Sequence, residues 1–151
     1  VDVSDRRLRI HYHALGGVAA SSPVVVLLHG SGPGTTAWGS FRRNIEALVD
    51  AGHRVLLVDL PGWGKSDPVV CTGSRPELNA RAVGRLLDVL HIQRPVHVIG
   101  SSMGAHSSVA LALAEPQRVD RLVLVAGGSG APPRAKPPAG APPRARPPRG
   151  V

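Results

Sequence analysis

The chain has 151 residues, of which 42% are apolar, 19% charged and 3% aromatic, and its formal net charge is +8. This length predicts a single folded domain, and the lone Cys71 excludes an internal disulfide and a cysteine-based zinc site. Apolar runs such as Val24 to Leu28 are far shorter than the roughly 20 residues of a membrane helix, and the first ten residues are too charged for a signal peptide. We therefore expect a cytoplasmic protein without a membrane partner.

The charge is unevenly distributed along the chain. Residues 1–130 carry 13 Lys or Arg against 10 Asp or Glu, whereas residues 131–151 carry five basic residues and no acidic one. The latter segment also holds 8 of the 15 prolines and repeats APPRAKPPAG as APPRARPPRG. We expect residues 1–130 to fold and residues 131–151 to form a disordered low-complexity tail. This tail either has no role, binds polyanions or binds a proline-recognising module, and no specific nucleic-acid partner is expected.

Strand-like and helix-like patterns alternate in the first half of the chain. Apolar residues at every second position predict a strand over residues 8–15, with His11 and His13 on its polar face. The continuous apolar runs at residues 24–28 and 55–60 predict strands that are buried on both faces. Between these two runs, the apolar residues Phe41, Ile45, Leu48 and Val49 recur at helical spacing, which predicts one helix that ends at Ala51-Gly52.

The second half of the chain continues this alternation. An amphipathic helix is predicted around residues 76–90, a buried strand at 96–99, a helix rich in small residues at 103–114 and a fourth buried strand at 121–126. Buried strands that alternate with helices favour an α/β fold, in which a mainly parallel sheet is covered by helices on both faces. Ligands bind such sheets beyond the carboxyl ends of the strands.

A G-x-S-x-G motif, Gly100-Ser101-Ser102-Met103-Gly104, stands between a predicted strand and a predicted helix. In that context the central serine occupies a sharp turn, and the helix N-terminus beside it stabilises developing negative charge. The alternative interpretation is an incidental turn of serine and glycine. The strand-turn-helix context favours Ser102 as a nucleophile.

The segment His29–Gly34, with the sequence HGSGPG, follows the predicted strand at residues 24–28. Its glycines allow the backbone to approach a substrate closely, as an oxyanion-binding loop must, while Met103 next to the nucleophile supplies another N–H donor. A phosphate-binding loop is the rival interpretation, but the chain has no G-x-x-x-x-G-K-[ST] motif and these glycines lack dinucleotide spacing. We therefore expect an oxyanion loop, with no cofactor and no metal.

Five segments in chain order resemble the meta-cleavage product hydrolases, an α/β-hydrolase family. They are HGSGPG at 29–34, FRRN at 41–44, VDLPGWGKSD at 58–67, LNARAV at 78–83 and GSSMGAHSSVALAL at 100–113. Members of this family are serine-dependent hydrolases of carbon–carbon bonds in aromatic catabolism. The resemblance extends to about residue 130 and is strongest to the 2-hydroxy-6-oxonona-2,4-dienedioate hydrolases of phenylpropionate degradation.

The resemblance implies that residues 1–130 are the amino-terminal part of an α/β-hydrolase core and that Ser102 is its nucleophile. The positions it assigns to the oxyanion site and to substrate binding are Ser31, Gly32, Ser40, Ser101 and Met103. Two of these, Ser40 and Ser101, stand where the family usually has asparagines, so they have a shorter reach toward the substrate. The implied substrate is a 2-hydroxy-6-oxo-dienoate, and a complete member of the family is expected to be a homo-oligomer.

The residues that follow Ser102 do not complete a triad in the order serine, acid, histidine. They include only two acids, Glu115 and Asp120, and only one histidine, His106, which lies in the predicted helix directly after the serine. We therefore expect a truncated enzyme with little or no activity, whose strand at 121–126 is an exposed, aggregation-prone edge. The alternatives are another serine hydrolase, such as an esterase, and a non-enzymatic remnant whose tail is the interacting part.

The remaining histidines and both tryptophans have structural interpretations. We expect no catalytic base among the histidines of the predicted strands, turns and helix ends, which are His11, His13, His29, His53, His91 and His97. Trp38 and Trp63 are expected in loops that border the site, where packing is favoured over stacking on a substrate.

Overall fold

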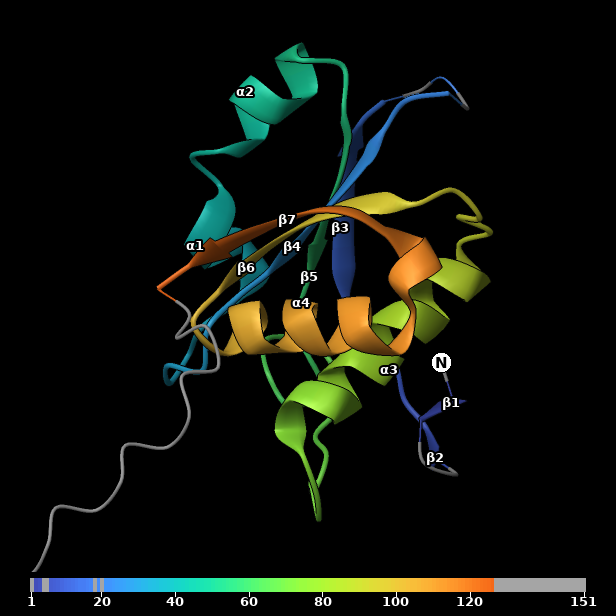
Figure 1. Cartoon of the computed structure of the whole chain (residues 1–151). Coiled ribbons are helices and arrows are strands. Elements are labelled where there is room, and N and C mark those ends of the chain that lie inside the picture. The colour runs from blue at the N-terminus through green and yellow to red at the C-terminus, as the bar shows by residue number, and fades with distance from the viewer. Residues whose placement is uncertain (1, 4–5, 18, 20, 127–151) are drawn as a thin grey trace, which may run out of the picture.

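A computed structural model describes residues 2–3, 6–17, 19 and 21–126 of the chain (Figure 1). The main sheet has five strands in the order β3-β5-β4-β6-β7, and only the pairing of β3 with β5 is antiparallel. These strands are β3 (Tyr12–Gly16), β4 (Val24–Leu28), β5 (Arg54–Val58), β6 (Val96–Ser101) and β7 (Val119–Val125). The predicted α/β class with a mainly parallel sheet is therefore confirmed.

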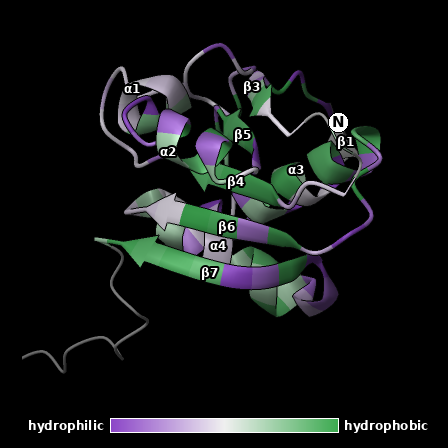
Figure 2. Ribbon diagram, turned by 90° about the horizontal axis from the view of Figure 1, so that it is seen from above, coloured by the Kyte–Doolittle hydropathy of each residue, from purple (hydrophilic) through white to green (hydrophobic). Residues whose placement is uncertain are grey.

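Helices cover both faces of this sheet, as Figures 1 and 2 show. They are α1 (Ala37–Phe41), α2 (Ile45–Asp50), α3 (Arg75–Val89) and α4 (Met103–Ala114), followed by the short 3₁₀ helix η1 (Pro116–Arg118). A separate two-stranded sheet pairs β1 (Asp2–Val3) with β2 (Arg6–Arg7). No helix in the described ranges combines the length and the apolar character that crossing a membrane requires.

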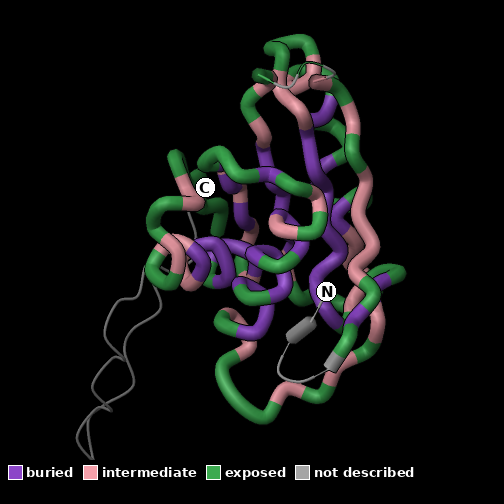
Figure 3. The backbone as a smooth tube through the Cα atoms, turned by 90° about the vertical axis from the view of Figure 1, so that its right-hand side faces the viewer, coloured by how far each residue is buried: buried purple, intermediate pink, exposed green. Residues whose placement is uncertain are grey.

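The core has two layers because successive side chains of a buried strand point to opposite faces. On β5, Val55 and Leu57 pack with α1 and α2, whereas Leu56 and Val58 join the cluster that includes residues of α3 and α4. These four side chains are almost fully buried. Figure 3 shows the buried segments concentrated in the central strands and the helix faces against them.

The single helix predicted across Phe41–Val49 is wrong, because the structure has two short helices there. The backbone N–H of Asn44 donates to the carbonyl oxygen of Phe41 at 2.8 Å, and this tight three-residue bond replaces continuous α-helical bonding. Trp38 consequently belongs to α1 and does not lie in a loop, contrary to the prediction. The face that the pattern marked as apolar is nevertheless the buried one, since Phe41 and Ile45 both belong to the core.

The predicted strand at 8–15 is only partly correct, because β3 begins at Tyr12. Upstream of it, the backbone N–H and carbonyl of Arg9 bond to Asp67 in the loop after β5. Leu8 is buried beside α3, against Leu78 and Ala82.

Among the described strands, the last one, β7, lies at one edge of the sheet, and Figure 2 shows the apolar stretch along it. Its apolar residues from Leu122 to Val125 are exposed. Val123 and Val125 have 51% and 47% of their surface exposed. The prediction of an exposed apolar edge at this strand is confirmed. The predicted tail at residues 131–151 lies outside the described residues.

Candidate active site

Ser102 lies at the turn between β6 and α4, and its backbone has φ 52° and ψ −113°. A positive φ is rare for a residue with a side chain, so this is a strained elbow. The strain is held by hydrogen bonds on both sides. The Ser102 N–H donates to the Val125 carbonyl oxygen at 2.8 Å, and the Ser102 carbonyl accepts from the Ala105 N–H at 3.0 Å. The serine side chain is exposed at the carboxyl end of the sheet, as a nucleophile requires.

The two glycines of the G-x-S-x-G motif make this turn possible. A Cβ atom at Gly104 would overlap the Leu28 carbonyl group and lie 2.7 Å from the His29 carbonyl oxygen. A Cβ atom at Gly100 would overlap the Gly104 carbonyl and the Ser108 hydroxyl. Helix α4 therefore starts in direct backbone contact with the end of β4, a separation that only glycine permits.

The predicted oxyanion loop lies beside the nucleophile, and Gly30 is the residue that contacts it. A Cβ atom at Gly30 would be 3.3 Å from Ser102 Cβ and 3.9 Å from Ser102 Oγ. Sequence reasoning assigned Ser31 and Gly32, which follow this contact and are exposed. The Gly32 carbonyl accepts a bond from the Thr35 N–H at 3.1 Å, so the loop turns back immediately. The sequence offered a signal for Gly30, because it is the first glycine after the predicted strand at 24–28 and directly follows His29.

Met103, the first residue of α4, provides the expected backbone donor next to the nucleophile. Its N–H has no hydrogen-bond acceptor within the described part of the chain, and its side chain packs against the core. The first N–H groups of a helix carry partial positive charge and have no intrahelical partner. The Met103 N–H can therefore bind an oxyanion that forms next to Ser102.

His29 fixes the start of the oxyanion loop. Its imidazole is fully buried; Nδ1–H donates to the Gly30 carbonyl oxygen at 2.7 Å, and Nε2 accepts the Leu60 N–H at 3.0 Å. Burial lowers the pKa of His29 and outweighs the opposing effects of the Gly30 carbonyl and of Asp59. The neutral ring ties the loop after β4 to the segment after β5, which agrees with its structural interpretation.

Ser40 and Ser101 line one cavity of about 440 Å³ between helices α1 and α2 and the strands. The cavity combines these hydroxyls and Asn44 with mostly apolar walls. The other lining residues are Leu27, Phe41, Ala47, Leu48, Ile99, Val123 and Val125. Sequence reasoning missed Phe41 and Asn44 as lining residues, because helical periodicity marked Phe41 only as core.

No histidine is placed to act as a base toward Ser102. All seven belong to the described residues, and none of their rings hydrogen-bonds to the Ser102 hydroxyl. His106 is exposed on α4 and bonds to the Ser102 carbonyl only through its backbone N–H, at 3.3 Å. Asp120 pairs with His97 at 3.2 Å near the amino end of β7, far along the strand from the elbow. Among the described residues, the predicted nucleophile and oxyanion donors thus lie without a histidine base beside them.

Comparison with known proteins identifies relatives of high similarity. The 2-hydroxy-6-oxononadienedioate/2-hydroxy-6-oxononatrienedioate hydrolase of Cupriavidus pinatubonensis is 60% identical over 128 residues, which are 85% of this chain and 43% of that protein. The protein of the same name from Escherichia coli K12 is 53% identical over 130 residues, covering 86% of this chain and 44% of the relative. The chain therefore spans less than half the length of these relatives.

Solved structures give a consistent result. A meta-cleavage product hydrolase of Pseudomonas fluorescens IP01 has a TM-score of 0.72 and 30% identity, over 83% of this chain and 43% of that one. The 2-hydroxy-6-oxo-6-phenylhexa-2,4-dienoate hydrolase of Rhodococcus sp. strain RHA1 has a TM-score of 0.74 and 32% identity. The match covers 87% of this chain and 46% of that one. Residues 23–146 match the family described as the alpha/beta hydrolase fold. The chain belongs to the α/β hydrolase fold family.

Proposed function

We propose that this chain carries the nucleophile and the oxyanion donors of a hydrolase that cleaves a carbon–carbon bond in 2-hydroxy-6-oxo-dienoates. The observation that carries the proposal is the elbow at Ser102, with φ 52° and with Gly30 directly against the serine side chain. The relatives at 53–60% identity, all named as hydrolases of such dienoates, support this reaction over ester hydrolysis.

The reaction we propose consumes one water molecule. After the dienol substrate ketonises, the Ser102 hydroxyl attacks the C6 carbonyl, and the resulting oxyanion accepts bonds from the Met103 N–H and the loop around Gly30. The proton of the Ser102 hydroxyl passes to solvent water. The C5–C6 bond then breaks, its electron pair is delocalised into the neighbouring 2-oxo acid, and C5 takes one proton back from solvent, so the proton count balances. Water finally hydrolyses the acyl-serine and leaves the C6 fragment as a carboxylic acid.

The cavity lined by Ser40 and Ser101 is the proposed place for part of the substrate. Its hydroxyls can donate to and accept from substrate oxygens, while its apolar walls exclude water from the hydrocarbon portion. Both hydroxyls are shorter than an asparagine amide and offer a single donor. We expect them to orient the substrate less tightly than two amides would.

Because the described part of this chain has no histidine base beside Ser102, we expect its rate of substrate turnover to be low. A triad serine without its base retains binding and oxyanion stabilisation, which give roughly 10³–10⁴-fold acceleration over water. Turnover should therefore be slow, yet it should still depend on Ser102.

The test measures loss of the absorbance of 2-hydroxy-6-oxonona-2,4-dienedioate, together with labelling by a fluorophosphonate probe. The unmodified chain should exceed Ser102→Ala in both assays. Ser21→Ala is the matched control, because this serine precedes β4 at the opposite end of the strands, and it should behave like the unmodified chain. Equal turnover by the chain and by Ser102→Ala would reject the proposal for this polypeptide.

A further inference from the structure

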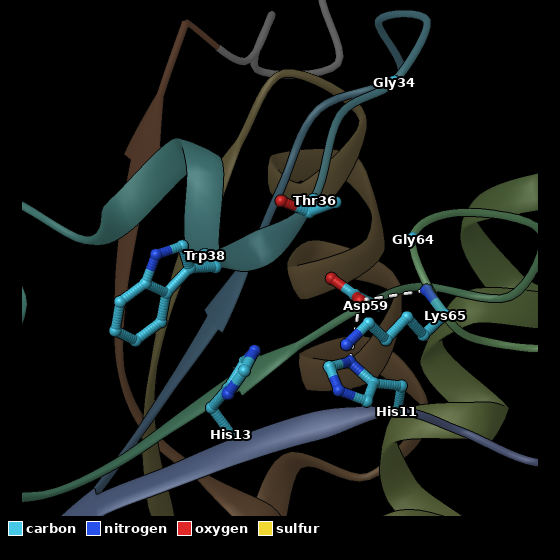
Figure 4. A pocket seen from close by; sticks show the side chains of 8 residues that line it. All are labelled: His11, His13, Gly34, Thr36, Trp38, Asp59, Gly64 and Lys65. Atoms are coloured by element: carbon cyan, nitrogen blue, oxygen red, sulfur yellow. Dashed lines mark hydrogen bonds and ion pairs between the residues drawn. The ribbon is translucent and has the colours of Figure 1, made fainter.

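A second cavity, of about 590 Å³, opens between the amino end of β3, helix α1 and the loop after β5 (Figure 4). His11 and His13 come from the β3 segment, Trp38 from α1 and Lys65 from the loop, while Asp59 lies at the base. It shares no lining residue with the cavity of Ser40 and Ser101. This cavity is therefore distinct from the cavity of Ser40 and Ser101, but Gly34 also lines it, so it borders the end of the predicted oxyanion loop.

The carboxylate at the base of this cavity is hydrogen-bonded on both of its oxygen atoms. Asp59 is buried and accepts bonds from the Ala37 N–H at 2.8 Å, from His11 Nδ1–H at 2.8 Å and from the Lys65 N–H at 3.2 Å. Burial raises its pKa, but the bonds from Ala37, Lys65 and His11 outweigh that effect and hold the pKa below its usual value. Asp59 thus remains ionised and orients the His11 ring, and three of its roughly four acceptor sites are occupied.

The other side-chain nitrogen atoms of the cavity have no hydrogen-bond partner among the described residues. Within the described ranges, neither His11 Nε2, nor the ring nitrogens of His13, nor the Lys65 ammonium forms a hydrogen bond or an ion pair with another residue. Figure 4 shows the Lys65 side chain extending over His11 toward His13. Because His11 gives its Nδ1–H to Asp59, its Nε2 is an acceptor in the neutral ring. The donors that remain for an anion are the Lys65 ammonium and a ring N–H of His13, and a carboxylate can accept from both.

Trp38 gives the cavity an aromatic wall. The indole is 43% exposed and lies 5.1 Å from the His13 ring at an interplanar angle of 49°. The His13 ring in turn meets the His11 ring edge-on at 4.8 Å. A planar ring placed beside Trp38 would remove exposed indole surface from water, which is favourable for aromatic pairs.

We propose that this cavity binds a small aromatic carboxylate, with its anionic group at Lys65 and His13 and its ring against Trp38. The carboxylate accepts hydrogen bonds from the Lys65 ammonium and from a ring N–H of His13, and the ring covers the exposed indole. A cavity with one aromatic wall and a few converging polar groups has the usual construction of a small-molecule site.

Three probes separate the contribution of the ligand's charge from the contribution of its aromatic ring. Benzoate has both charge and ring, benzamide has the ring alone, and cyclohexanecarboxylate has the charge alone. We expect benzoate to bind best by calorimetry and to shift the Trp38 indole N–H signal in NMR spectra. Trp63 is the internal control, because its ring packs beside His29 and under Arg75, and its signal should not move.

Substitutions then assign each contact. Lys65→Gln should weaken benzoate binding by about tenfold and leave benzamide binding unchanged, as expected for the loss of a charge-assisted bond. Trp38→Leu should weaken benzoate and benzamide but not cyclohexanecarboxylate. His53→Gln, an imidazole just before β5 at the other end of the strand, should leave all three affinities unchanged.

Several results would overturn the proposal. Absence of any benzoate-dependent signal, equal affinity for the three probes, or benzoate binding that survives both Lys65→Gln and Trp38→Leu would each refute it. Circular dichroism of both variants checks that they fold. Ser102→Ala must leave benzoate binding intact, because a loss there would place the ligand in the proposed active site. Benzoate binding is measured without turnover, so its outcome does not depend on whether the chain hydrolyses a dienoate.

Discussion

At the scale of single residues, two buried polar side chains connect the loops that form the site. Asp59 joins the segment before β3, the start of α1 and the loop after β5 through its bonds to His11, Ala37 and Lys65. His29 joins the loop after β4 to Leu60. Each residue is favourable only in one protonation state, since a protonated carboxyl loses acceptor strength and a protonated imidazole cannot accept the Leu60 N–H.

These two residues predict how stability depends on pH. Both have a pKa below its ordinary value in the folded chain, so the unfolded chain binds more protons and stability falls as pH falls. The contribution of His29 is complete above its ordinary pKa of about 6.5 and is lost as the pH falls toward its lower folded value. The contribution of Asp59 is complete above its ordinary pKa of about 3.9 and is lost below it.

Urea denaturation at a series of pH values checks this prediction. The free energy of unfolding should decrease between about pH 7 and pH 5, and His29→Leu should reduce that slope. Since His29→Leu removes two hydrogen bonds and could fail to fold, the ring signals of His29 in the unmodified chain give a second measurement. An imidazole that becomes fully charged above pH 6.5 in the folded state would contradict the prediction.

At the scale of elements, the contact between α4 and β4 depends on the absence of a side chain at one position. Gly104→Ala places a methyl group on the Leu28 carbonyl. The atoms it meets belong to the backbone of Leu28 and His29, which cannot move aside as a flexible side chain can. We expect a loss of about 3 kcal/mol in the free energy of unfolding, at the upper end of the usual overpacking cost. Gly73→Ala is the matched control, because a Cβ atom there meets nothing within 4 Å. Equal stability of the two variants would show that the elbow can relax.

The exposed edge of β7 predicts self-association of the chain. Unpaired backbone groups beside apolar side chains favour edge-to-edge pairing, and a lysine on an edge strand opposes it. Val123→Lys should therefore lower the apparent mass in sedimentation velocity experiments. Leu113→Lys adds the same charge at an exposed position of α4, outside any strand edge, and should change the mass much less. A chain that is monomeric before substitution would refute this prediction.

The elements that the sequence predicted well are those set by local patterns. Helix α4 spans Met103–Ala114 as predicted, because the G-x-S-x-G turn fixes its start and small residues continue to its end. The break between α1 and α2 depends on one backbone bond at Asn44, which no periodicity encodes.

The same distinction applies to the candidate site. The elbow at Ser102 could be read from five consecutive residues, whereas the cavity at His11 and Asp59 joins residues 48 positions apart. Alternation placed His11 on a polar face, but only the tertiary structure shows which loop that face meets.

At the scale of the whole molecule, an open sheet edge and the missing base predict a specific form of complementation. Serine hydrolases of this fold take their acid and histidine from positions that follow the serine. The chain matches 43% of the Cupriavidus pinatubonensis relative, and within the described ranges β7 pairs with β6 on one side only, so its other side can take a further strand. A second polypeptide that contains the remainder of that relative should therefore pair with β7 and bring an imidazole to Ser102.

Dienoate turnover in the mixture measures this effect. Restoring a base to a triad serine is worth about 10²–10³-fold or more in rate, so the mixture should greatly exceed the sum of its parts. The gain should vanish with Ser102→Ala in this chain, and also when every histidine of the second polypeptide is replaced by glutamine. Leu124→Lys, on the same strand but outside the lining of the proposed substrate cavity, should weaken the gain by weakening strand pairing. A gain that survives Ser102→Ala would arise from the second polypeptide itself and would contradict the role proposed for this serine.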